Sequence, residues 1–302
     1  MIYHCTFILI TLSFMRKTIL ITGATGFLGS HLLSELISLN FNIIILKRST
    51  SKIWRIEHLK EKYISYDIDL EAINKAFIEN NIDIIIHTAC NYGRDIESVH
   101  EIIESNLLFG LKILELAIAN GVKTFINTDT LLPRDLNSYS LSKKHMVDWL
   151  KYKSNMIKVI NLKIEHIFGP KDSGNKLVPW ILTQLKENKK EIKLTKGTQK
   201  RDFIFIDDII LAFLVVINKS GNLPKYTEFE VGTGKLTSVK DFIILLKKEF
   251  EEISGPTKTK LLFGEIDYRE NEIMSIIVEN KKLIDLGWFV KTNLNKDIKK
   301  CI

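Results

Sequence analysis

The sequence predicts an α/β fold in which a doubly wound parallel sheet is joined to a smaller C-terminal α/β lobe. Two observations predict the sheet: β-rich apolar runs alternate with helical patterns between residues 17 and 164, and a glycine cluster directly follows the first run. Strands that alternate with helices require a parallel sheet covered on both faces. The alternation breaks after Phe168-Gly169-Pro170, which predicts the second lobe.

The individual elements follow from the period and length of the apolar patterns. Strands are expected at 17–22, 42–46, just before Asp67, and at 83–88, 123–128 and 157–164. The helices expected between them are 27–39, 70–80, 98–120 and 140–153. Beyond residue 170 we expect helices at 177–188, 207–217 and 239–253, and a strand at 227–231.

Composition bounds the class of protein. The chain has 302 residues, of which 45% are hydrophobic and 26% charged, so it is neither disordered nor fibrous and is long enough to bury a large core. Its three cysteines are scattered, which argues against a disulfide framework or a metal site and favours a reducing cytoplasm.

The net charge of +7 raises the question of a nucleic-acid partner. The lysines are spread singly and in pairs rather than in one block, so a solvated surface is the preferred interpretation and no nucleic acid is expected. A basic cleft for an anionic ligand stays open.

Residues 1–14 are apolar, which suggests a signal peptide or a membrane anchor. No basic residue precedes the apolar run, and the run is shorter than the roughly 20 residues that span a bilayer. We therefore expect an N-terminal extension without function, a true start at Met15 and no membrane association.

The glycine cluster reads Gly23-Ala24-Thr25-Gly26-Phe27-Leu28-Gly29 and stands between the first strand and the first helix. Glycines at these places allow a tight turn and a close backbone approach to a diphosphate, to which the helix N-terminus adds N–H donors. This context predicts a dinucleotide site.

The end of the second strand indicates which dinucleotide binds. NAD sites place an acid there to accept from the ribose 2′-hydroxyl, but this chain has Lys47 and Arg48. Two cations suit a 2′-phosphate, so NADP(H) is favoured and NAD(H) remains an alternative. The other interpretation of both side chains is that they are solvated loop residues.

A phenol and an ammonium share one helix face at Tyr139 and Lys143, because they are four residues apart. A cation beside a phenol lowers its pKa and suits it to proton exchange. Thr128 ends a strand eleven residues earlier, at the sheet edge where ligands bind, and its hydroxyl is a candidate partner for a substrate oxygen.

These motifs, taken together and in order, resemble those of the extended short-chain dehydrogenase/reductases. The resemblance rests on the glycine cluster, His87-Thr88-Ala89-Cys90, Thr128, Tyr139 with Lys143, Phe168-Gly169-Pro170, the stretch 201–208 and Leu286-Gly287-Trp288. It implies a Rossmann domain over 15–168, a nucleotide-sugar-binding lobe mainly over 169–302 and a homodimer. Within the family, the stretches 127–130, 226–234 and 271–274 most resemble NADPH-dependent 4-keto reductases of nucleotide-linked deoxysugars.

The resemblance also implies roles for single residues. Tyr139 would protonate O4 of the sugar, Lys143 would hold the nicotinamide ribose and tune Tyr139, and Thr128 would orient the 4-oxygen. Further cofactor contacts are expected from Asp67, Ile68, Thr88 and Ala89, although Asp67 is equally explained as a helix cap. Substrate contacts are expected from Asn91, Tyr92, His166, Asn175, Arg201 and Arg269. For His166 the alternative is a core histidine, and for each arginine a surface ion pair.

One departure from the family narrows the reaction. A dehydratase carries Asp-Glu directly after the active-site threonine, whereas this chain has Thr128-Asp129-Thr130, so 4,6-dehydration is not expected. The role of Asp129 is left open between structure and catalysis. The expected function is reduction of a CDP- or GDP-linked 4-keto-deoxysugar for surface polysaccharides. The alternatives are an NAD-dependent 4-epimerase and a non-catalytic dinucleotide sensor.

Overall fold

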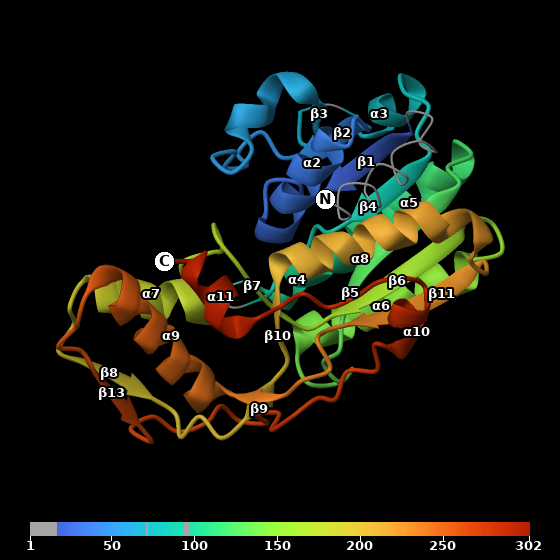
Figure 1. The fold of residues 1–302 in the computed structure, drawn as a ribbon. Coiled ribbons are helices and arrows are strands. Elements are labelled where there is room, and N and C mark those ends of the chain that lie inside the picture. The colour runs from blue at the N-terminus through green and yellow to red at the C-terminus, as the bar shows by residue number, and fades with distance from the viewer. Residues whose placement is uncertain (1–16, 71, 94–96) are drawn as a thin grey trace. The chain divides into compact units, whose positions relative to one another are not determined.

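A computed structural model describes residues 17–70, 72–93 and 97–302 (Figure 1). The expected N-terminal extension and the start at Met15 lie outside these residues. The described residues form two compact units. The first contains the described residues between 17 and 129 together with 137–161 and 220–228, and the second contains 130–136, 162–219 and 229–302.

A seven-stranded sheet in the order β11-β6-β5-β4-β1-β2-β3 confirms the predicted doubly wound fold. Parallel registers join β1 to β2 and β4, β2 to β3, and β4 to β5. The strands are β1 (Thr18–Thr22), β2 (Asn42–Lys47), β3 (Ile64–Asp67), β4 (Ile84–His87), β5 (Thr124–Thr130), β6 (Lys158–Ile164) and β11 (Tyr226–Val231). The strand order reverses between β1 and β4, which is where ligands bind in open sheets of this kind.

The first unit also contains helical segments. They are α2 (Phe27–Ser38), η1 (Glu57–Lys62), α3 (Asn74–Ile78), α4 (Val99–Ile103), η2 (Glu104–Leu108), α5 (Phe109–Ala119), α6 (Ser138–Lys153) and η3 (Ser220–Asn222). One core cluster combines Leu20, Ile44 and Ile85 of the sheet with Ile113 of α5 and Leu150 of α6. Each buried aliphatic side chain contributes about 1.5–3 kcal/mol.

Two helices differ from their expected form. Of residues 70 and 72–80, Asn74–Ile78 form a helix, and Leu70, which extended the apolar pattern, is 73% exposed instead of buried. The helix expected over 98–120 contains a π-helical turn, η2, between α4 and α5. Such turns frequently occur at functional sites.

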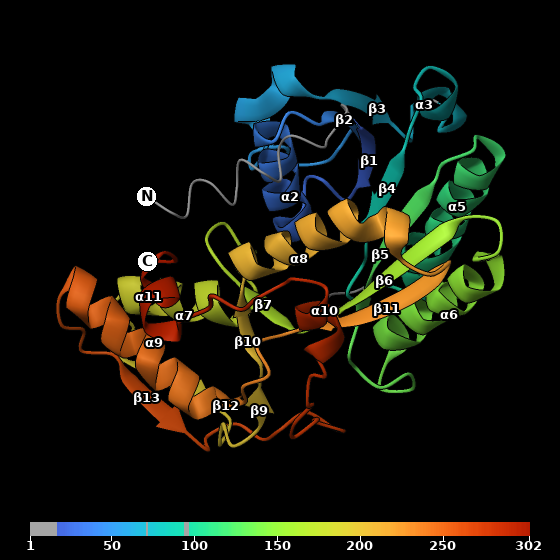
Figure 2. The ribbon, with the colours of Figure 1, turned by 45° about the vertical axis from the view of Figure 1, so that its right-hand side comes forward.

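The second unit contains pairs of short strands and several helices (Figure 2). The pairs are β7 (His166–Phe168) with β10 (Phe203–Phe205), β9 (Lys200–Arg201) with β12 (Thr237–Ser238), and β8 (Glu191–Leu194) with β13 (Lys260–Phe263). The helices are α7 (Leu177–Lys186), α8 (Ile206–Lys219), α9 (Val239–Ser254), α10 (Lys281–Asp285) and α11 (Leu294–Lys299). Helix α9 contacts α7 and α11, and Phe242 of α9 stacks on Phe203 at 3.7 Å between ring centroids.

Two buried aspartates of the stretch 201–208 anchor distant parts of this unit. Asp202 accepts hydrogen bonds from Thr233 N and Gly234 N at 2.8 and 2.7 Å. Asp208 accepts from Thr292 N at 2.7 Å, and its own carbonyl accepts from the buried Trp288 indole. Burial raises the pKa of both carboxyls, and these hydrogen bonds oppose the rise.

Over 17–70, 72–93 and 97–302, the helices are too short or too polar for a bilayer crossing.

Candidate active site

The glycine cluster forms the turn between β1 and α2, as expected. Gly23 has φ +72°, and a Cβ there would lie 2.6 Å from Ala89 N. A Cβ on Gly29 would lie 2.2 Å from Gly23 O, so only glycine lets the first turn of α2 close onto the strand end. Gly26 is the N-cap residue of α2, and no side chain among the described residues caps it, which leaves the amide end of the helix open.

The end of β4 lies against this turn. Thr88 Oγ1 donates to Thr22 O at 2.7 Å, and Ala89 N donates to Thr22 Oγ1 at 3.3 Å. The structure therefore brings Thr88 and Ala89 beside the glycine turn, at the strand reversal. Thr25 lies in the same turn, where Arg55 donates to Thr25 O at 3.4 Å, and Phe27 and Leu28 begin α2. Arg55 was not foreseen, because no motif links it to the turn.

The ends of β2 and β3 hold the other expected cofactor residues. Lys47 and Asp67 are paired in the sheet register, and their side chains form an ion pair. Ile68 N donates to Lys47 O at 2.9 Å, which continues this pairing by one residue. Arg48 is exposed. Of the two expected cations, Lys47 is thus already neutralised.

Helix α6 presents Tyr139 and Lys143 one turn apart. A capping box starts the helix: the Asn137 side chain accepts from Ser140 N at 2.9 Å, and Ser140 Oγ accepts from Asn137 N at 3.2 Å. The Tyr139 ring stacks on Tyr92 with 5.1 Å between centroids, which brings together a predicted catalytic residue and a predicted substrate residue.

The Lys143 side chain is buried, with a relative exposure of 2%. Burial lowers its pKa, Cys90 and Asp129 oppose the lowering, and Lys144 adds to it. Among the described residues none makes a hydrogen bond to this ammonium. A buried amine without such a partner is costly unless a ligand supplies one.

Thr128 of β5 and His87 of β4 are buried and joined by a hydrogen bond. Thr128 Oγ1 donates to His87 O at 3.0 Å, so its single hydroxyl proton is in use while its lone pairs stay available. His87 Nδ1 lies 2.8 Å from Thr22 Oγ1, and its buried Nε2 has no partner in the described part of the chain. Burial, with a smaller effect of Lys143, lowers the pKa of His87 to about 3, so the imidazole is neutral.

A buried amide that sequence reasoning missed holds the loop after β4. Asn106 lies in the π-helical turn and accepts from Asn91 N at 2.6 Å, while its Nδ2 donates to Asn91 O and to Ser142 Oγ. Asn106 therefore ties the expected substrate residue Asn91 to α6, next to Lys143. Its place in an ordinary helical pattern gives no sequence signal.

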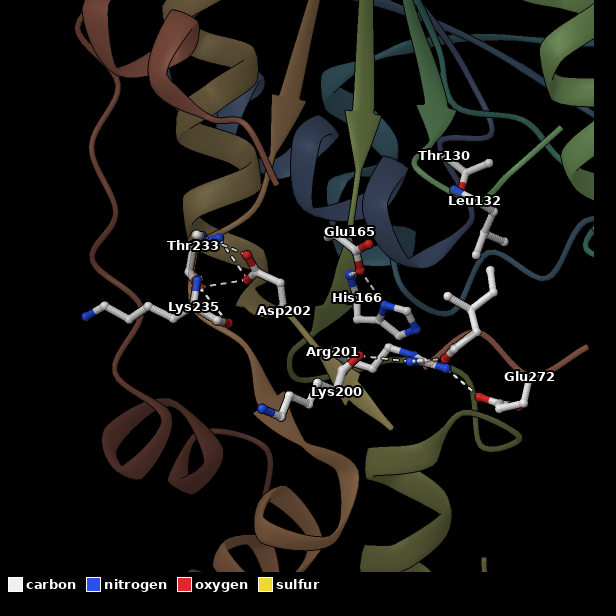
Figure 3. Close-up of polar contacts among 12 residues, drawn as sticks. Thr130, Leu132, Glu165, His166, Lys200, Arg201, Asp202, Thr233, Lys235 and Glu272 are labelled. Atoms are coloured by element: carbon white, nitrogen blue, oxygen red, sulfur yellow. Dashed lines mark hydrogen bonds and ion pairs between the residues drawn. The ribbon is translucent and has the colours of Figure 1, made fainter. Parts of the chain in front are cut away.

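The other expected substrate residues belong to the second unit (Figure 3). Arg201 binds Glu272 in an ion pair and donates to Ile273 O at 2.7 Å. Arg269 is exposed and lies three residues before Glu272 in the segment 269–273. Glu272 N donates a hydrogen bond to the Arg269 carbonyl at 3.1 Å. The structure thus brings Arg201 against the segment that carries Arg269.

His166 and Asn175 complete this set. His166 Nδ1 lies 2.5 Å from Oε2 of the buried Glu165, and the imidazole is 41% exposed (Figure 3). The expectation that His166 is a core histidine is therefore not met. Asn175 is exposed in the turn before α7.

The residues of the first unit fit a nicotinamide dinucleotide. The open amide end of α2 and the glycine turn fit a diphosphate, and the buried Lys143 ammonium lacks the oxygen partner that a ribose hydroxyl would supply. Within the described ranges, no group of three potential metal-ligating side chains occurs.

Comparison with known proteins gives consistent matches over most of the chain. The NAD dependent epimerase/dehydratase family matches residues 19–232. Two proteins named CDP-abequose synthase, from Salmonella typhimurium and Salmonella muenchen, are 32% and 34% identical, and the matches cover 96% and 95% of this chain and 99% and 98% of theirs. The structure of UDP-glucose 4-epimerase from Thermotoga maritima superposes with a TM-score of 0.81 at 21% identity, over 93% of this chain and 96% of that one. At 21% identity, this structural match supports the fold alone.

Proposed function

The chain belongs to the NAD-dependent epimerase/dehydratase family, and from this membership we propose that it reduces the 4-keto group of a CDP- or GDP-linked deoxysugar with NADPH. The observation that carries the proposal is the nearly full-length similarity to two proteins named CDP-abequose synthase, a name that denotes a CDP-linked sugar. The product would serve surface-polysaccharide synthesis.

Residues of the first unit would hold the cofactor. The glycine turn and the amides of α2 receive its diphosphate, Lys143 donates to the nicotinamide ribose, and Arg48 pairs with the 2′-phosphate. When bound, the reduced nicotinamide supplies the hydride for C4 of the sugar.

Tyr139 supplies the proton. As the C4 carbonyl is reduced, its oxygen gains negative charge, and the Tyr139 phenol donates a proton to O4 and is reprotonated from solvent. The charged Lys143 one turn along α6 stabilises the phenolate that this transfer leaves. Thr128 acts as an acceptor for a substrate hydroxyl, because its own proton is bound by His87 O.

The second unit would bind the nucleotide sugar. Arg201 and Arg269 suit the diphosphate, since a guanidinium pairs bidentately with phosphate oxygens. His166 and Asn91 would contact the sugar, with the His166 ring oriented by Glu165 and the Asn91 backbone held by Asn106.

The test is the loss of NADPH absorbance with a panel of CDP- and GDP-linked 4-keto-6-deoxy and 3,6-dideoxy sugars. We expect one NADPH to be oxidised per molecule of one panel member. The absence of consumption across the panel, together with NAD(H) that copurifies with the protein, would overturn the proposal.

One observation favours a second candidate, an NAD-dependent 4-epimerase. Asp67 neutralises Lys47, which removes one of the two cations that favour a 2′-phosphate. An epimerase regenerates its nicotinamide in each turnover, whereas a reductase consumes it. Interconversion of two nucleotide sugars without net NADPH loss identifies this candidate.

A further inference from the structure

One cation at the glycine turn takes no part in the steps above. Arg55 Nη1 donates to the carbonyl of Thr25, which lies in the turn between β1 and α2, at 3.4 Å. The guanidinium of Arg55 also lies over the indole ring of Trp54, with 4.3 Å between Cζ and the ring centroid. A hydrogen bond and a stacking contact thus hold the Arg55 guanidinium at the turn.

The loop that carries Arg55 is anchored on both sides of this residue. Near the end of β2, the Ser49 hydroxyl and backbone N–H both donate to the Asp69 carboxylate, at 2.6 and 2.8 Å. Directly after Arg55, the Ile56 side chain is completely buried, and Ile56 N donates to Ile53 O at 2.8 Å. These contacts restrict the places that the Arg55 side chain can reach, so its position at the turn follows from the fold.

A guanidinium at this place is electrostatically unfavourable without an anion nearby. Thr25 directly precedes Gly26, the N-cap of α2, and the N-terminus of a helix carries positive partial charge that attracts anions and repels cations. The first turn of α2 contains no acidic residue that would offset the added charge of Arg55. A bound phosphate would interact favourably with both the helix N-terminus and the guanidinium.

We propose that Arg55 binds the diphosphate of the nicotinamide dinucleotide together with the amides of α2, and that Trp54 is a positioning residue for the Arg55 guanidinium. The indole contacts the face of the guanidinium, whereas the N–H donors that pair with phosphate oxygens lie in its plane. The inference rests on the proposed function for the presence of the cofactor, and it adds a residue to the diphosphate site. Its role differs from that of Arg48, which is assigned to the 2′-phosphate.

Two nucleotides separate the diphosphate from the 2′-phosphate, because NADH and NADPH both contain the former and only NADPH contains the latter. Arg55→Leu is expected to weaken binding of both nucleotides by about tenfold or more, since a charge-assisted contact with phosphate is lost. A loss for NADPH alone would assign Arg55 to the 2′-phosphate and overturn the proposal. Unchanged affinity for both nucleotides would remove Arg55 from the cofactor site.

The matched control is Lys52→Leu. Lys52 is exposed on the same loop, so its substitution removes the same charge three residues before Arg55. We expect the affinities for NADH and NADPH to change little in this variant. Losses as large as those of Arg55→Leu would mean that the nucleotides respond to the general charge of the loop, which would contradict a specific contact.

Two further variants separate phosphate binding from a structural link between the loop and the glycine turn. Arg55→Gln keeps an N–H donor for Thr25 O and loses the charge, whereas Arg55→Lys keeps the charge. We expect the lysine variant to bind both nucleotides more tightly than the glutamine variant, and added salt to weaken binding less in the glutamine variant than in the wild type. Equal affinities of the two variants, with the salt dependence of the wild type, would show that Arg55 only links the loop to the turn.

The role of Trp54 has its own pair of variants. Trp54→Leu removes the aromatic face under the guanidinium and is expected to weaken binding of both nucleotides several-fold, and Trp54→Phe is expected to restore most of the affinity. Trp54 is 51% exposed, so neither substitution opens a cavity in the core. Wild-type affinity in Trp54→Leu, or no recovery in Trp54→Phe, would reject the positioning role.

The experiment is calorimetric titration of the full chain and its variants with NADH and with NADPH, at low and at high salt. If Arg55→Leu does not fold, the comparison of Arg55→Lys with Arg55→Gln decides. Weaker binding of both nucleotides to Arg55→Leu, with a wild type that oxidises no NADPH across the sugar panel, would uphold the role of Arg55 and reject the reductase. Stoichiometric NADPH oxidation by the wild type, with unchanged affinities in Arg55→Leu, would reject the role of Arg55 alone.

Discussion

Lys47 at the end of β2 forms an ion pair with Asp67 at the end of β3, across the sheet register that aligns these two residues. The strand ends therefore present one neutralised cation and one exposed arginine, Arg48, to the place where the adenosine ribose of a dinucleotide would lie. Asp67 also places a carboxylate near that ribose. We therefore propose that Arg48 and Asp67 together determine the cofactor preference.

Asp67→Asn is expected to strengthen NADPH binding relative to NADH. The substitution frees Lys47 and removes a negative charge that repels a 2′-phosphate. Arg48→Leu is expected to weaken NADPH binding by about tenfold while changing NADH binding little, because a charge-assisted phosphate contact is lost. Fluorescence titration with each nucleotide measures both ratios. A preference for NADPH that neither variant alters would show that other residues select the cofactor.

Tyr139→Phe is expected to abolish reduction and leave cofactor binding intact. The variant keeps the ring that stacks on Tyr92 but loses the proton donor, so kcat is expected to fall about 10²–10⁴-fold. The matched control is Tyr152→Phe on the same helix, whose side chain is 71% exposed and which should retain full activity. Comparable rates for the two variants would assign the proton to another group.

Gly29→Ala is expected to weaken NADPH binding and destabilise the protein by about 1–3 kcal/mol, because its Cβ would lie 2.2 Å from Gly23 O and force α2 away from the turn. No atom of residues 17–70, 72–93 or 97–302 lies within 4 Å of the corresponding Cβ at Gly221, so Gly221→Ala is the control. Urea unfolding and NADPH titration measure the two effects. Wild-type behaviour of Gly29→Ala would contradict the close approach at this turn.

Asn106→Ala is expected to lower the free energy of unfolding by about 2 kcal/mol, because it leaves buried polar groups of Asn91 and Ser142 without their partner. Asn120→Ala removes one exposed hydrogen bond to Leu116 O and is expected to cost less than about 0.5 kcal/mol. Urea unfolding of both variants checks the difference. Equal losses would mean that the amide in the π-helical turn does not hold the loop.

These residues also show what the sequence could and could not predict. The alternation of apolar periods and the glycine spacing are local patterns, so the parallel sheet, the turn after β1 and the shared face of Tyr139 and Lys143 were all accessible. A π-helical turn depends on hydrogen bonds within one helix and leaves the apolar pattern nearly unchanged. The role of Asn106 therefore could not be predicted from the sequence.

Ion pairs between residues far apart in the sequence could not be predicted for another reason. Lys47 and Asp67 are 20 residues apart, and Arg201 and Glu272 are 71 residues apart. Their contacts follow from strand register and from the course of a long segment, which no local period encodes. The sequence therefore offered an ion pair for Arg201 only as an alternative and gave no partner for Lys47, although both are paired in the structure.

The pair of Arg201 and Glu272 gives the last prediction. Glu272 occupies the guanidinium that a diphosphate would use, and both side chains are largely buried, with exposures of 12% and 20%. Binding of a nucleotide diphosphate then has to replace this carboxylate. Glu272→Gln is therefore expected to strengthen binding of CDP several-fold, and Arg201→Met to weaken it by about tenfold or more.

Calorimetric titration with CDP measures these affinities, and Glu270→Gln is the matched control. Glu270 is exposed two residues before Glu272, so its substitution changes the net charge equally without releasing Arg201. A gain in Glu272→Gln alone would identify competition for the Arg201 guanidinium. Equal gains in both variants would mean that CDP responds only to the general charge of the segment, and unchanged affinity in Arg201→Met would remove Arg201 from the diphosphate site.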